Sequence, residues 1–291
     1  MRVSLLHNLG AGHGFSLESV IEELTRQGHE LVKAVDSHTA LAQLRQPSID
    51  AVVVAGGDAT VATAVVAFTG QKTPLAILPV GTANNIARSL GINVGPLKDM
   101  IARWTEAREL RIDTGVATGE WGDRSFVEGV GGGLIADGMA TLSSSVTDSP
   151  GDRETALKRA LEGFRDTLSH LRPQRWSYRI DGTPFTDDLL LFEALNMRSV
   201  GPVLQLSSAV DPGDGLLSVV TAREEHREEL DRYLLARINN LPAHIELPTS
   251  HGARIDMEHP GPFHMDDGVR RMKEGGTVSL RIDAGSLVVL V

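Results

Sequence analysis

The chain has 291 residues, of which 41% are hydrophobic and 23% charged; this composition is typical of a folded globular protein, and the length predicts two domains. It contains no cysteine, which excludes disulfides, thiolate zinc ligands and a cysteine nucleophile and suits a cytoplasmic protein. The net charge of −10 argues against nucleic acid as a partner. We expect no signal peptide, and no apolar run approaches the ~20 residues that span a bilayer.

Residues 1–113 alternate short apolar runs with amphipathic segments. The apolar runs predict strands at Val3–Leu6, Leu31–Val35, Ala51–Ala55 and Leu75–Leu78. Helices are predicted from Ser16, as the cap, to Gly28, and at Ala40–Arg45, Thr60–Phe68 and Asn85–Leu90. Because strands and helices that alternate at these lengths form βαβ units, we expect an α/β domain with a parallel sheet.

Residues 114–291 have the pattern of a β-rich, sandwich-like domain. Whether the final strand pairs with the first domain is left open. Strands are predicted at Ser125–Val130, Trp176–Ile180, Leu189–Asn196, Leu216–Thr221, Ala253–Met257, Thr277–Ile282 and Ser286–Val291. Helices are predicted at Arg153–Leu171 and Glu224–Asn239, and a mobile loop at Ser143–Asp152. In the first of these helices, Leu157, Leu161, Phe164 and Leu168 form a stripe that we expect to face the core rather than a membrane.

The strongest local motif is Ala51-Val-Val-Val-Ala-Gly-Gly-Asp-Ala-Thr60, in which a buried strand meets two glycines, an aspartate and a helix. A helix start offers free N–H groups to a phosphate, and Gly56 and Gly57 let the backbone approach it closely. Asp58 is positioned to hold Mg²⁺ or to act on an acceptor hydroxyl. The alternative is a plain turn in which Asp58 only caps the helix.

A second strand-loop-helix unit has the same layout: Leu75-Ala-Ile-Leu-Pro-Val-Gly-Thr-Ala-Asn-Asn-Ile-Ala-Arg88. Gly81 permits close approach, Thr82 offers a hydroxyl, and Asn84 or Asn85 can cap the helix or adopt the left-handed conformation. In a parallel sheet both loops emerge at the carboxyl ends of strands, which is where open α/β folds bind ligands.

Together, Gly56-Gly57-Asp58-Ala59-Thr60 and Leu78-Pro-Val-Gly-Thr-Ala-Asn-Asn-Ile-Ala-Arg-Ser-Leu-Gly91 resemble the catalytic domain of the diacylglycerol kinase family, which includes sphingosine, ceramide and bacterial lipid kinases. The family's opening Asn-Pro-x-x-Gly is similar to Asn8-Leu-Gly-Ala-Gly12, without the proline. Its later pattern is similar to Leu195-Asn196 and Asp211-Pro-Gly-Asp-Gly-Leu-Leu217, so the resemblance spans nearly the whole chain.

The resemblance implies an ATP-dependent kinase, with a nucleotide-binding first domain and an acceptor-binding second domain, that phosphorylates a hydroxyl of a lipid such as diacylglycerol or a sphingoid base. It implies an ATP site formed by Asn8, Gly56, Gly57, Asp58, Ala59, Thr60, Gly81 and Thr82. It also implies a Mg²⁺ position at Asp211, Asp214 and the carbonyl of Leu216, for which a simple Asp/Gly turn is the alternative. Since the chain is acidic, contact with the membrane surface is expected to be transient and peripheral.

Two departures from the family pattern bear on activity. Ala59 replaces a usual glycine, which matters only if that residue needs a positive φ. Where the family has Asp-Gly-Glu or Asp-Asp-Glu, with the glutamate as general base, this chain has His264-Met-Asp-Asp-Gly-Val269. Either Asp267 or Asp266 acts as the base, or turnover is low or absent.

Other assignments stay open. One alternative is a soluble-substrate kinase similar to NAD kinases, and another is a relative that binds nucleotide or lipid without turnover. The oligomeric state is open too, and a homodimer is one alternative. A metal cluster of His251, Asp256, Glu258, His259 and His264 is conceivable, but the spacings match no helix face, so we expect scattered surface histidines.

Overall fold

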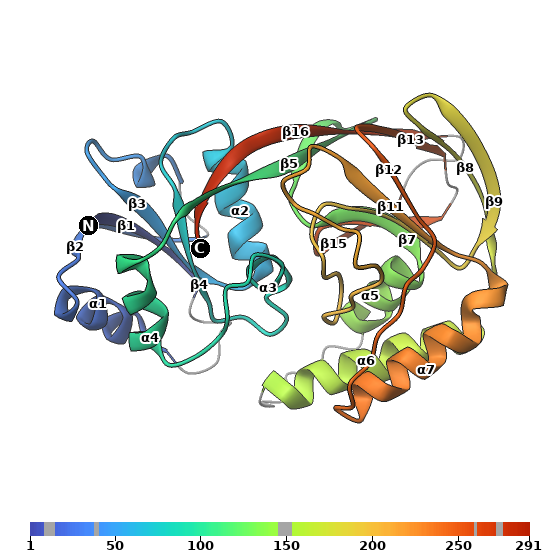
Figure 1. Cartoon of the computed structure of the whole chain (residues 1–291), viewed down its shortest axis with the longest axis horizontal. Coiled ribbons are helices and arrows are strands. Elements are labelled where there is room, and N and C mark those ends of the chain that lie inside the picture. The colour runs from blue at the N-terminus through green and yellow to red at the C-terminus, as the bar shows by residue number, and fades with distance from the viewer. Residues whose placement is uncertain (9–14, 38–40, 145–152, 259–260, 272–275) are drawn as a thin grey trace. The chain divides into compact units, whose positions relative to one another are not determined.

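The computed structural model describes residues 1–8, 15–37, 41–144, 153–258, 261–271 and 276–291 (Figure 1). The chain forms two compact units: residues 1–114 together with 285–291, and residues 115–284. Strands β5 (Glu109–Gly119) and β16 (Thr277–Leu290) each contain residues of both units. Most of the loop predicted at Ser143–Asp152 lies outside the described residues, and so does Ala40.

The first unit is built on a parallel sheet with the strand order β2-β1-β3-β4. Its strands are β1 (Arg2–His7), β2 (Glu30–Asp36), β3 (Ala51–Gly56) and β4 (Leu75–Pro79). β3 and β4 are buried along their whole length, as strands covered on both faces are expected to be. The end of β16 extends this sheet, because Val289 pairs in parallel with Leu75. The predicted α/β fold with a parallel sheet is confirmed.

Helices cover both faces of this sheet: α1 (Leu17–Arg26), α2 (Asp58–Phe68), α3 (Asn85–Ser89) and α4 (Leu97–Ala102), with 3₁₀ turns at Leu41–Leu44 and Arg103–Thr105. Ser16 caps α1 as predicted, since its hydroxyl accepts a hydrogen bond from the N–H of Ser19 at 3.1 Å. α1 and α4 share one apolar core with alternate residues of β1 and β3, while α2 lies on the other side of the sheet (Figure 1). The sequence does not predict α4, because its six residues are too few to establish a helical period.

The second unit is a sandwich of two β-layers. One is an antiparallel sheet with the order β12-β11-β10-β7-β14-β15, and the other contains β16-β13-β8-β9. The strands are β6 (Gly122–Phe126), β7 (Gly129–Gly133), β8 (Gln174–Ile180), β9 (Thr183–Leu189), β10 (Leu191–Leu195), β11 (Leu217–Ala222), β12 (Thr249–Gly252), β13 (Arg254–Glu258), β14 (Pro262–Met265) and β15 (Gly268–Arg271). Between the layers Trp176 stacks on Phe192, with ring centroids 4.8 Å apart. The predicted sandwich-like fold is confirmed.

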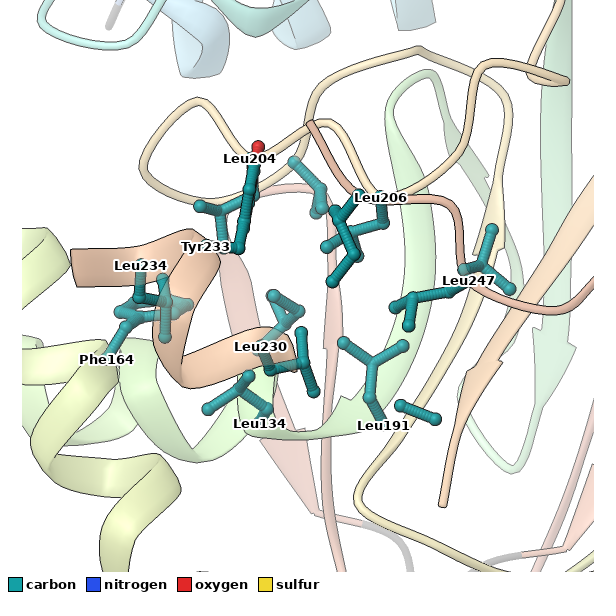
Figure 2. Packing of buried hydrophobic residues seen from close by; sticks show 14 of the residues in the cluster. Leu134, Phe164, Leu191, Leu204, Leu206, Leu230, Tyr233, Leu234 and Leu247 are labelled. Carbon is teal, nitrogen blue, oxygen red and sulfur yellow. The ribbon is translucent and has the colours of Figure 1, made fainter. Parts of the chain in front are cut away.

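A helical layer covers the outer face of the six-stranded sheet. It consists of α5 (Leu134–Ser144), α6 (Arg153–His170) and α7 (Arg227–Ile238), with a 3₁₀ turn at Glu224–His226. Leu161, Phe164 and Leu168 of α6 are buried against this sheet and α7, so the stripe of α6 faces the core as predicted (Figure 2). Among the described residues, no helix combines the length and the apolar character that crossing a membrane requires.

Some predicted strands are wrong in their boundaries, for identifiable reasons. Ser125–Val130 is not one strand, since β6 ends at Phe126 and β7 begins at Gly129. Val127 and Glu128 leave the ladder because their N–H groups donate to the carboxylate of Asp266.

The two strands predicted at the carboxyl end are instead one strand, β16. The apparent break is Gly285, which has φ +57°. The strand continues through it because the Gly285 N–H donates to the carboxylate of Asp113, on the neighbouring strand β5, at 2.6 Å.

Candidate functional site

Three strands of the parallel sheet in the first unit end at the same edge. β1, β3 and β4 are neighbours in register, with His7 opposite Ala55 and Gly56 opposite Pro79. The residues that follow these strands therefore gather at one edge of the sheet. They include Asn8, whose N–H donates to the carbonyl of Ala55 at 3.0 Å. The rest of the motif at Asn8-Leu-Gly-Ala-Gly12 lies outside the described residues.

Gly57 and Gly81 bring the loops after β3 and β4 into direct backbone contact. A Cβ on Gly81 would lie 2.4 Å from Cα of Gly57, and a Cβ on Gly57 would lie 3.2 Å from Cα of Gly81. The first distance is too short for any real side chain, so the close approach requires glycine. Gly57 is also the N-cap of α2. The result is a cradle of bare backbone at a helix start, an arrangement that suits a phosphate group.

Asp58 and Asn84 fix the geometry of this cradle. The Asp58 carboxylate accepts a hydrogen bond from the N–H of Ile86, at the start of α3, at 3.0 Å. Asn84 has the left-handed conformation (φ +54°), and its side-chain amide bonds both backbone groups of Gly81, at 3.0 and 2.8 Å. The two loops after β3 and β4 are thus tied together by side chains as well as by backbone contact.

The remaining residues of the predicted ATP site differ in exposure. Thr82 is half-buried, whereas Thr60 is only 3% exposed and its side chain packs directly on Gly56. Ala59 lies in the first turn of α2 and is not among the described residues with a positive φ, so the replacement of glycine there costs no backbone strain. The structure therefore brings the ATP-site residues predicted in the first unit together at one sheet edge.

Asp211 and Asp214 lie in an exposed loop of the second unit, between β10 and β11. The Asp211 carboxylate accepts from the N–H of Gly213 at 3.1 Å, and that of Asp214 from the N–H of Leu216 at 2.9 Å. These are the bonds of two Asx turns. Within the described residues, no group of three or more His, Asp or Glu side chains is arranged to hold a metal. The Mg²⁺ position at Asp211, Asp214 and Leu216 stays a prediction.

Asp266 and Asp267 form the turn of the hairpin between β14 and β15, also in the second unit. Asp266 has φ +50°, and its carboxylate accepts hydrogen bonds from the N–H groups of Val127, Glu128 and Gly129 at 2.8 to 3.4 Å. Burial raises the pKa of Asp266 to about 6, although the three N–H groups act in the opposite direction. Asp267 is exposed.

The carboxylates of the two predicted catalytic aspartates in this turn thus have different environments. That of Asp266 accepts hydrogen bonds from three backbone N–H groups and so anchors the segment that carries them. Asp267 has the accessibility that a base acting on a hydroxyl needs.

Residues 4–117 match the family described as the diacylglycerol kinase catalytic domain, a range that contains both glycine loops and Asp58. A protein of Mycobacterium tuberculosis (strain H37Rv) named diacylglycerol kinase is 30% identical over 282 residues, covering 89% of this chain and 86% of that protein. This chain belongs to the diacylglycerol kinase family.

A second relative of that name, from Bacillus subtilis (strain 168), is 26% identical over 244 residues, which cover 79% of this chain and 77% of the relative. The fold agrees with the crystal structure of a diacylglycerol kinase from Bacillus anthracis str. Sterne, at a TM-score of 0.69 and 17% identity over 99% of this chain and 96% of that one. The chain therefore belongs to a family of lipid kinases, in agreement with the resemblance seen in its sequence.

In this member of the diacylglycerol kinase family, one pair of buried residues is not predicted from the sequence. His264 is fully buried, and its Nε2 lies 2.7 Å from Oε2 of Glu193, which is fully buried too. The expectation that His264 is a surface histidine is wrong. The feature of the sequence that could have indicated this pair is Glu193, a charged residue at the centre of the apolar run Leu189–Asn196.

Proposed function

We propose that this chain transfers the γ-phosphoryl group of Mg·ATP to the free hydroxyl of diacylglycerol. The observation that carries this proposal is the cradle formed by Gly57 and Gly81, with Asp58 in the first turn of α2. The relatives named diacylglycerol kinase supply the acceptor class.

In this reaction a bond forms between the acceptor oxygen and the γ-phosphorus while the bond from that phosphorus to the bridging oxygen of ADP breaks. The chain has to hold the phosphates, place the hydroxyl and accept its proton. The start of α2, beside the glycine cradle, supplies backbone donors for the phosphates. Asp58 would hold the Mg²⁺ that accompanies ATP through a hard carboxylate oxygen, and we assign the proton to Asp267.

A non-catalytic role is the second candidate, because Gly268 and Val269 stand where the family has a glutamate. A non-catalytic protein would bind nucleotide or lipid but would transfer no phosphate, whereas a kinase would do both.

The test is a transfer assay with the purified protein, Mg²⁺ and ATP labelled on the γ-phosphate. Separate reactions contain phospholipid vesicles with diacylglycerol, vesicles with a sphingoid base, and NAD in solution. We expect labelled phosphatidic acid from the first reaction and on the order of 10²-fold less from an Asp58→Asn control. Label in NAD alone would replace the proposal with the NAD-kinase alternative, and the absence of label in all three reactions would support the non-catalytic one.

A further inference from the structure

The buried pair Glu193 and His264 lies across a glycine. β7 is the strand between β10 and β14, and Gly131 of β7 is in register with Glu193 on one side and with His264 on the other. A Cβ on Gly131 would lie 2.3 Å from Cδ and Oε2 of Glu193. The absence of a side chain at Gly131 therefore leaves the space in which the two side chains meet.

The hydrogen bonds of the His264 ring determine where its protons are. Nδ1 lies 2.9 Å from the backbone carbonyl oxygen of Asp266, which can only accept, so Nδ1 carries a proton and donates it. One further proton is shared between Nε2 and Oε2 of Glu193, so the pair has no net charge wherever that proton resides. Burial raises the pKa of Glu193, and its buried Oε1 has no hydrogen-bond partner among the described residues, which favours the uncharged acid.

The Glu193–His264 pair supplies the last of the hydrogen bonds that hold Asp266 in place. The Asp266 N–H donates to the carbonyl of Gly129 at 2.9 Å, its carboxylate holds the N–H groups of residues 127–129, and its own carbonyl is held by His264. All hydrogen-bonding groups of this residue are thereby engaged. The next residue is Asp267, whose place on the hairpin turn is set by the bonds on either side of it.

Stability alone does not account for such a pair. A buried ionisable pair costs desolvation, and apolar side chains of similar volume are often as stabilising or more so. Well-oriented hydrogen bonds do, however, hold one backbone geometry in preference to its neighbours, and a catalytic group displaced by about 1 Å can lose about 10²-fold in rate.

We propose that Glu193 and His264 are positioning residues that hold the Asp266 carbonyl and so set the place of Asp267. The proposal rests on the proposed function, which gives Asp267 its part in phosphoryl transfer. Glu193 acts through His264, which in turn acts through the backbone of Asp266.

Two substitutions of His264 separate the two bonds of the ring. Asparagine reaches as far as Nδ1 does and keeps a donor for the Asp266 carbonyl, whereas glutamine reaches to the Nε2 position and keeps only the contact with Glu193. We expect His264→Gln to lower kcat by roughly 10–10²-fold with the KM for ATP unchanged, and His264→Asn to keep clearly more turnover than His264→Gln. The matched control is His251→Gln, which changes a histidine on the edge strand β12 of the same sheet. Equal losses in both His264 variants, or wild-type kcat in His264→Gln, would overturn the proposal.

A second measurement does not depend on catalysis. Amide hydrogen exchange should show Val127, Glu128 and Gly129 exchanging faster in His264→Gln than in His264→Asn, because the Asp266 carboxylate that bonds them is no longer held. Histidine labelled with ¹⁵N should show a protonated Nδ1 in the wild-type ring. If wild-type protein transfers no phosphate, the proposed function fails while these readouts still test the positioning. Unchanged exchange in both variants, or an unprotonated Nδ1, would refute the positioning itself.

Discussion

The carboxylate of Asp58 in the first turn of α2 accepts a hydrogen bond from the backbone N–H of Ile86 in the first turn of α3, at 3.0 Å. One side chain therefore bridges the starts of two helices that follow neighbouring strands. Both helix starts carry partial positive charge, which favours a carboxylate there and an anionic phosphate beside it. Asp58 thus has a structural part, capping α3, in addition to the catalytic part proposed for it.

Substitution of Asp58 should separate these two parts. An asparagine side chain retains an oxygen that can accept from Ile86, so Asp58→Asn should keep most of the stability while turnover falls on the order of 10²-fold or more. Asp58→Ala also loses the cap, at a cost of about 0.5–2 kcal/mol in the free energy of unfolding. Urea denaturation and the labelled-ATP assay measure the two effects. Wild-type turnover in Asp58→Asn would exclude the residue from the mechanism.

The contact between Gly57 and Gly81 can be tested by adding a methyl group. In Gly81→Ala the new Cβ would lie 2.4 Å from Cα of Gly57, so the two loops must separate. We expect the free energy of unfolding to fall by about 1–3 kcal/mol and ATP affinity, measured by calorimetry, to fall with it. Gly57→Val, with its larger side chain beside Gly81, should abolish ATP binding.

The control for these variants is Gly95→Ala in the same unit, since a Cβ there meets nothing within 4 Å. Gly95→Ala should leave both quantities unchanged. If folded Gly57→Val binds ATP as the wild type does, the nucleotide site does not lie in these loops.

The sequence predicts the first unit better than the second, for a physical reason. In a parallel sheet, the apolar runs give the strands, and the polar residues after each strand necessarily share an edge. The fold of the second unit, in contrast, depends on how antiparallel strands that are distant in the sequence pair with one another. Gly131–Gly133 of β7 have poor intrinsic preference for strands, so the central strand of the six-stranded sheet is not recognised as such. Without β7, nothing in the sequence brings Glu193 and His264 together.

The elevated pKa of Asp266, about 6 against an ordinary 3.8, makes a definite prediction for stability. Between these two values the folded protein holds the proton more tightly than the unfolded chain, so the contribution of Asp266 to stability falls as pH rises through this window. Asp266→Asn removes the titration, and asparagine tolerates the left-handed conformation. We expect the wild-type free energy of unfolding, relative to that of the variant, to decrease from pH 3.8 to about pH 6. A difference that stays constant or increases in urea titrations would contradict the assignment.

β16 should be essential for folding rather than for catalysis. Val278 and Leu280 are fully buried in the sandwich core, and Leu287 and Val289 are 1% and 0% exposed. Each such side chain contributes about 1.5–3 kcal/mol, and together they approach the total stability of a typical protein. A chain ending at Gly275 should therefore be insoluble or lack a cooperative thermal transition, whereas Leu280→Ala alone should be folded and less stable by about 2–5 kcal/mol. A folded, active truncation would show that the strand is dispensable.

The base proposed in the hairpin turn at Asp266–Asp267 can be tested by substitution. A positioned base contributes typically ~10²–10⁴-fold to the attack of a hydroxyl. If Asp267 supplies it, Asp267→Asn should lower kcat by about that factor and leave the KM for ATP unchanged. If the site has no base, wild-type turnover is already poor, and a glutamate in the turn should raise it.

The structure accommodates that glutamate at two positions. A Cβ on Gly268 would lie 3.5 Å from the Met265 carbonyl oxygen, an ordinary contact, and Gly268 has no positive φ that a side chain would strain. Val269 is 36% exposed, so a carboxylate there would be hydrated. Gly268→Glu and Val269→Glu should therefore both fold, and steady-state kinetics on them and on Asp267→Asn separate the two accounts. We expect the loss in Asp267→Asn and no gain in either glutamate variant; wild-type turnover in Asp267→Asn, with a large gain in a glutamate variant, would show instead a site that has lost its base.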